Sequence, residues 1–74
     1  MKKIYRYYCL FRPPMPGTIP RGTVSIKDFD ERRMVPEIDR EAWGFVEYER
    51  ELTKTEIDGY ELMPGGEFDR ITER

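Results

Sequence analysis

Apolar and polar positions alternate in three stretches of the chain, and this pattern predicts three β-strands. The first, residues 3–12, is rich in aromatic side chains, which favour a pleated surface. It ends at Pro13-Pro14, where the missing amide donors interrupt a strand ladder. The other two are residues 23–30 and 42–50. We expect an antiparallel sheet in which the first strand is central and pairs with both of the others.

The second and third strands are each predicted to bury one face. In the second strand, Val24 and Ile26 lie on one face and Ser25 and Lys27 on the other, so we expect a half-buried strand with the two apolar side chains inward. In the third, one face carries small side chains at Ala42 and Gly44, which would let a helix approach closely. The opposite face of the third strand carries two aromatic and two acidic residues: Trp43, Phe45, Glu47 and Glu49.

Residues 52–62 are predicted to form a helix. Thr53 and Glu56 have the spacing of a capping box, in which each side chain accepts a hydrogen bond from the other residue's backbone amide. The apolar stripe of this segment is short, and Pro64-Gly65-Gly66 ends it. The sequence therefore defines the start of this helix better than its interior.

Two loops complete the predicted fold. Residues 13–22, the Pro-rich loop, hold four prolines and two glycines, a density that excludes a helix or a central strand. Residues 31–41 are mostly charged and are expected to form a second loop. We predict an α+β domain over residues 1–63, with a three-stranded antiparallel sheet and one short C-terminal helix packed on one face (β-β-β-α). Residues 64–74 are expected to be a flexible tail.

The composition argues against several classes of enzyme. The 74 residues include one cysteine, one serine and no histidine, so a nucleophile that relies on a histidine base and a multi-cysteine zinc site are both excluded. Cys9 lies inside an aromatic strand, where we expect a buried and inert thiol. Asp28 and Asp30 resemble the start of a calcium loop that lacks its glycine and terminal glutamate. We expect no enzyme activity, no catalytic residues, no metal and no cofactor.

The hydropathy of the chain predicts a soluble protein. No apolar run approaches the ~20 residues that a membrane-spanning helix needs. The N-terminal residues lead into tyrosines and an arginine, not into the apolar core of a signal peptide. We expect a cytoplasmic protein without a membrane partner.

Charge is distributed unevenly along the chain. Residues 1–27 carry six bases and no acid, whereas residues 28–74 carry seven bases and fifteen acids. Two interpretations follow: a basic contact surface beside an acidic one, or two halves of a fold that neutralise each other.

The first binding hypothesis is a protein partner. Trp43 and Phe45, flanked by Glu47 and Glu49, combine aromatic anchors with a charged rim, as protein interfaces do. The acids of the second half could also imitate nucleic acid in a partner's basic groove. An uncovered face and an unpaired edge would equally allow a homodimer.

The second hypothesis is nucleic acid. Tyr5, Arg6, Tyr8 and Arg12 place rings for base stacking and cations for phosphates along one strand. Against it, the glycine-aromatic run of an RNA-recognition domain is absent, and the acidic second half would repel a phosphate backbone.

Several short motifs occur in an order that resembles a known family. They are Tyr5-Arg6-Tyr7-Tyr8, Arg12-Pro13-Pro14, Pro16-Gly17-Thr18, Phe29-Asp30-Glu31-Arg32, Ala42-Trp43-Gly44, Leu52-Thr53 and Tyr60-Glu61-Leu62. In residues 4–62 the chain resembles small uncharacterised proteins of phages and conjugative elements of gut-dwelling Firmicutes, which also occur as a domain associated with large polyvalent proteins.

The resemblance implies a binding protein of a mobile genetic element that disables host machinery, such as a restriction or CRISPR nuclease. It brings no functional residues that could be transferred to this chain. An anti-CRISPR or anti-restriction role is therefore an expectation about the class of partner, a host protein, and not about particular side chains.

Overall fold

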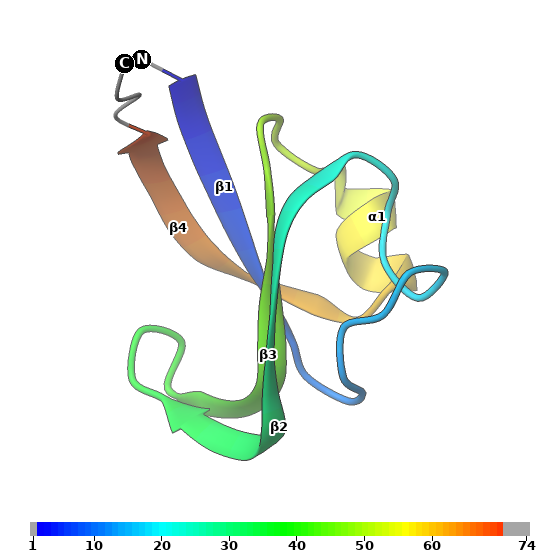
Figure 1. Cartoon of the computed structure of the whole chain (residues 1–74), viewed down its shortest axis with the longest axis vertical. Coiled ribbons are helices and arrows are strands. Elements are labelled where there is room, and N and C mark those ends of the chain that lie inside the picture. Colours follow the sequence, from blue (N-terminus) through cyan, green and yellow to red (C-terminus); the bar gives the residue numbers. More distant parts are fainter. Residues whose placement is uncertain (1, 71–74) are drawn as a thin grey trace.

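The computed structural model describes residues 2–70, which form one antiparallel sheet of four strands and one short helix (Figure 1). The strands lie side by side in the order β2-β3-β1-β4. The elements in chain order are β1 (Lys2–Cys9), β2 (Thr23–Val35), β3 (Arg40–Tyr48), α1 (Lys54–Gly59) and β4 (Leu62–Arg70). No helix among residues 2–70 is long and apolar enough to cross a membrane.

The prediction of a three-stranded sheet is wrong, because Leu62–Arg70 forms a fourth strand along β1. Most of this strand comes from residues expected in the tail; residues 71–74 lie outside the described part. Pro64 fits because β4 is an edge strand, where a missing amide donor breaks no second ladder. Gly65 fits because a Cβ at this position would overlap the ring of Tyr8.

The predicted pairing of the second strand with the first is also wrong. β1 is central, but its neighbours are β3 and β4, and β2 pairs with β3 in a long hairpin. A register shift between Asp28 and Arg33 bends β2, with Asp30 in the left-handed region at φ 66°. Beyond this bulge the strand continues to Val35, so most of the charged segment expected to be a loop is strand.

The helix-side face of the sheet carries a hydrophobic cluster. Val46 and Tyr48 of β3 are completely buried there, and Ile57 of α1 packs against them. The Pro-rich loop covers the same face: Ile19 belongs to the cluster, and the Tyr48 hydroxyl donates a 2.6 Å hydrogen bond to the carbonyl of Pro20. The loop is therefore an ordered part of the core.

Two expectations about this face need correction. The element close to Gly44 is not the helix: a Cβ there would overlap the carbonyl oxygen of Lys27 and come within 3.0 Å of the Pro14 ring. Val24 and Ile26 are not buried but exposed, at 41% and 44%, because β2 is an edge strand.

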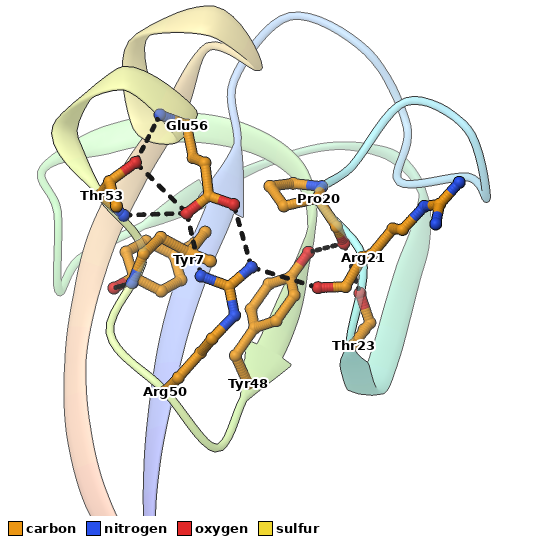
Figure 2. Close-up of polar contacts among 9 residues, drawn as sticks. Tyr7, Pro20, Arg21, Thr23, Tyr48, Arg50, Thr53 and Glu56 are labelled. Atoms are coloured by element: carbon orange, nitrogen blue, oxygen red, sulfur yellow. Dashed lines mark hydrogen bonds and ion pairs between the residues drawn. The ribbon is translucent and has the colours of Figure 1, made fainter.

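The capping box is confirmed, although α1 is shorter than predicted. The Thr53 hydroxyl accepts from the Glu56 amide at 3.1 Å, and the Glu56 carboxylate accepts from the Thr53 amide at 2.9 Å. Glu56 also forms a bidentate ion pair with Arg50, in which both nitrogen–oxygen distances are 2.9 Å (Figure 2). Nη2 of Arg50, one of the two nitrogens that bond Glu56, also donates to the carbonyl of Arg21 at 3.3 Å, so this arginine joins the helix cap to the Pro-rich loop.

Glu56 is expected to make the domain sensitive to acid. The hydrogen bonds from Arg50, followed by that from the Thr53 amide, lower the pKa of Glu56 from 4.5 to about 2. The pKa of Glu56 is lower in the folded than in the unfolded state, so its ionised carboxylate stabilises the fold. This stabilisation is complete above the unfolded-state pKa and is lost as pH falls from 4.5 towards 2. In urea unfolding, the stability difference between the wild type and Glu56→Gln should shrink across this range.

A matched variant tests the cause of that pH dependence. Arg50→Met removes the largest contribution to the low pKa of Glu56, so it should flatten the same part of the stability profile. If Glu56→Gln keeps the wild-type decline between these two pH values, the carboxylate is not its source.

Candidate functional site

The face of the sheet opposite α1, called the outer face below, carries the most distinctive side-chain arrangement of the molecule. The strand register places Tyr8 opposite Phe45, Arg6 opposite Glu47, and Ile4 opposite Phe68. The outer face consists of side chains from all four strands: Ile4, Arg6, Tyr8, Phe29, Phe45, Glu47, Met63 and Phe68.

Arg6 lies at the centre of this face between two aromatic rings. Its guanidinium carbon is 4.2 Å from the centroid of Phe45 and 4.5 Å from that of Phe68. Glu47 accepts a 2.8 Å hydrogen bond from Nε of Arg6 and lies 2.7 Å from its terminal nitrogen. Both side chains are partly buried, at 25% and 16% exposure. Burial opposes the charge, but hydrogen bonding by Tyr8 and Glu47 outweighs it, and the pKa of Arg6 is raised.

Aromatic contacts extend this stack across the sheet. The rings of Tyr8 and Phe45 meet edge to face with centroids 5.7 Å apart, and Phe29 meets Phe45 in the same way at 6.0 Å. Arg33 lies over Phe29 at 5.6 Å. A continuous series of arginine–ring and ring–ring contacts therefore runs from β4 to β2, and each cation–π contact contributes ~0.5–2 kcal/mol.

Two shallow hollows flank Arg6 on the outer face. One, of about 230 Å³, is lined by Ile4, Ser25, Glu47 and Phe68 together with Arg6. The other, of about 310 Å³, lies towards the end of the β2–β3 hairpin and includes Phe29, Arg33 and Met34. Phe68 and Met34, one in each hollow, keep 42% and 57% of their surface exposed. The face thus offers apolar contact area on both sides of a fixed ion pair.

The structure places two of the four residues predicted to bind a partner in the outer-face cluster around Arg6. Phe45 and Glu47 lie on the outer face, where both are held by Arg6. Trp43 is half buried, and Glu49 is exposed beyond the end of β3. Sequence reasoning missed Phe68 because its segment was assigned to the tail. The sequence does contain a signal for this strand: the apolar pair Leu62-Met63 before the glycines and Phe68 after them match the pattern of a strand with a bulge.

The four residues of the nucleic-acid hypothesis are also divided. Tyr5 packs against the helix-side cluster, and Tyr8 is only 3% exposed. Arg6 and Arg12 form ion pairs with Glu47 and Glu61. A surface that combines free rings with free cations is therefore not formed by this set.

The uneven charge of the sequence is partly neutralised inside the fold. Lys3, Arg6 and Arg12 from the basic segment each pair with an acid of the second half: Glu67, Glu47 and Glu61 respectively. The interpretation that the two halves neutralise each other is confirmed for these three bases.

Cys9 is the buried thiol expected from its strand. It is 4% exposed and belongs to the helix-side cluster. Burial raises the pKa of Cys9 to about 11, so the reactive thiolate is scarce at neutral pH. The carboxylate of Asp28, considered for a calcium loop, accepts a 2.8 Å hydrogen bond from the Asp30 amide within a turn.

The fold and the outer face define a small α+β domain: a four-stranded antiparallel sheet whose helix and Pro-rich loop cover one face and whose other face carries an arginine–aromatic stack. A family model described as "Defence against restriction A C-terminal" matches residues 2–67, and the chain belongs to this family. No curated protein and no solved structure matched the chain. The family supports the link to counter-defence that the sequence resemblance implies; the Firmicutes setting stays a prediction.

Proposed function

We propose that the chain is a non-enzymatic binding domain that protects the DNA of a phage or other mobile element by occupying a host restriction nuclease through the outer face. The family match over residues 2–67 carries this proposal, because the family is described by defence against restriction. Restriction acts on DNA inside the host cell, so the proposal places the domain in the host cytoplasm.

The composition of the outer face supports a protein partner. Binding hot spots are rich in arginine and aromatic residues that are fixed before the partner arrives. Phe45 and Phe68 hold the guanidinium of Arg6, and Glu47 fixes its orientation. The order of these side chains reduces the conformational entropy that binding would otherwise cost.

Nucleic acid is the less favoured partner. Arg6 and Arg12 already pair with carboxylates, and the ring of Tyr8 is inside the molecule, so few phosphate or base contacts remain for this set. Titration with single-stranded DNA at low salt separates the two ideas, since phosphate-dominated binding weakens steeply as salt rises.

The proposal predicts that expression of the chain increases the transformation efficiency of unmodified plasmid in a host that carries a matching restriction system. Phe68→Ser should reduce this protection by at least about tenfold, the effect of losing one hot-spot side chain. The assay compares restricting and non-restricting strains, and CRISPR-carrying strains provide a separate arm for that class of nuclease. Purified nuclease and chain, mixed and measured by calorimetry, give the affinity directly.

Phe11→Ser is the matched control, because Phe11 is a more exposed phenylalanine, at 59%, that is not part of the outer face. It should leave protection unchanged. Equal transformation with and without the chain in every restricting strain would refute the proposal, as would equal loss in the two variants when circular dichroism shows that both are folded.

A further inference from the structure

The two edges of the sheet differ in how they are protected from strand addition. The edge strand β4 contains Pro64, and its register with β1 shifts between Tyr5 and Tyr7, so it presents no regular row of free backbone groups. The first part of β2, from Thr23 to Asp28, forms the opposite edge; it contains no proline, and after a register shift between Thr23 and Ser25 its pairing with β3 is regular from Ser25 to Asp28 (Figure 1). Its outward backbone groups have no partner strand within the sheet, so this part of β2 can accept another extended segment.

Apolar surface lies next to this unprotected edge. Ile26 is opposite Val46 in the register and therefore lies on the helix-side face, with 44% of its surface exposed. A hollow of about 250 Å³ between β2 and the Pro-rich loop is lined by Ile26 together with Ile19 and Pro20. A strand added to β2 would direct every second side chain towards this hollow.

The same edge carries uncompensated positive charge. Lys27 lies opposite Phe45 and thus on the other face from Ile26, and Arg21 precedes the strand. Both are exposed, and neither takes part in the ion pairs found within the described residues. The nearby acids are engaged elsewhere: Glu47, opposite Ser25, pairs with Arg6, and the Asp28 carboxylate accepts from the Asp30 amide. Lys27 and Arg21 can therefore attract carboxylates of a partner.

We propose that the β2 edge from Thr23 to Asp28 binds an extended acidic segment of a partner protein by β-strand addition. Apolar side chains of the segment enter the hollow beside Ile26, and its alternate carboxylates face Lys27. The hollow beside Ile26 shares no lining residue with the outer face, whereas Ser25 and Lys27 border that face opposite Glu47 and Phe45. Strand addition at this edge is a second contact beyond the proposed function.

The test uses a short acetylated and amidated peptide of alternating glutamate and valine, titrated into the whole chain at low salt. We expect saturable binding that weakens with salt, and protection of β2 amides from hydrogen exchange. Ile26→Asp and Lys27→Glu should each weaken the binding by at least about tenfold. A peptide with a central proline should not bind, because proline removes a ladder donor.

Met34→Asp and Arg40→Glu are the matched controls: Met34 is an exposed apolar residue beyond the bulge of β2, and Arg40 is an exposed base at the far end of the hairpin. Both variants should bind the peptide as the wild type does.

The proposal is overturned if the peptide does not bind at low salt, or if a lysine–valine peptide binds equally well. It is also overturned if light scattering shows a dimer that Ile26→Asp dissociates, because the edge would then be occupied by a second copy. None of these readouts involves restriction, so they are independent of the protection assay.

Discussion

Replacing Tyr48 by alanine is expected to lower the free energy of unfolding by about 3–5 kcal/mol, the cost of deleting a large buried aromatic side chain. Tyr48 is 0% exposed, and its ring meets that of Tyr7 with centroids 6.2 Å apart. A domain of 74 residues has a total stability of only ~4–11 kcal/mol at 0.05–0.15 kcal/mol per residue, so this one change removes a large fraction of it. Urea unfolding followed by circular dichroism measures the effect.

Tyr48→Phe separates the ring from its hydroxyl. Burial raises the pKa of Tyr48, so the hydroxyl keeps its proton at neutral pH and donates to Pro20. Removing only this donor leaves the Pro20 carbonyl with its longer 3.3 Å hydrogen bond from the Thr23 hydroxyl, so the loss should be about 0.5–1.5 kcal/mol, the net value of one hydrogen bond. If Tyr48→Phe destabilises the domain as much as Tyr48→Ala, the hydrogen bond to the Pro-rich loop, and not ring packing, is the main contribution of this residue.

Replacing Gly44 by alanine is expected to destabilise the domain by about 2–3 kcal/mol or more, because the added methyl group has no space. It would overlap the backbone carbonyl oxygen of Lys27 and press on the ring of Pro14 at 3.0 Å. A backbone atom of a paired strand cannot move aside as a flexible side chain can, so relief requires β2 and β3 to shift. Thermal unfolding of the variant should show a lower midpoint.

Gly59→Ala is the control for this substitution. No atom lies within 4 Å of a Cβ at Gly59, and the residue ends α1 in a conformation that alanine can adopt. Alanine is favoured over glycine in a helix by about 0.5–1 kcal/mol, so this variant should be as stable as the wild type or more stable. A similar loss of stability in both variants would argue against the close packing at Gly44.

Local sequence signals predicted the elements whose cause is local. The capping box at Thr53 and Glu56 depends on residues three apart, and its hydrogen bonds form as expected. The alternation along β1 and β3 likewise depends on neighbouring residues, and Tyr7 and Val46 lie on the helix-side face as strand periodicity requires.

The fourth strand could not be predicted in this way because its cause lies at the other end of the chain. Pro64-Gly65-Gly66 is unfavourable for an isolated strand, yet β4 forms because the edge of β1 pairs with it and Tyr8 packs beneath Gly65. The candidate site was only partly predictable for the same reason. Phe45 and Glu47 were identified from their own strand, but Phe68 joins them only through pairing with Ile4, 64 residues away in the chain.

The sequence by itself determined the start of the helix, the existence of β1, β2 and β3, and the buried state of Cys9. Only the tertiary structure decided that Arg6, which looks like a phosphate ligand beside tyrosines, lies between Phe45 and Phe68 with Glu47 as its partner. The physical reason is that a partly buried guanidinium between two rings is stabilised by a carboxylate, and sheet pairing across 41 residues of sequence supplies it. The same pairing determines which edge of the sheet remains open.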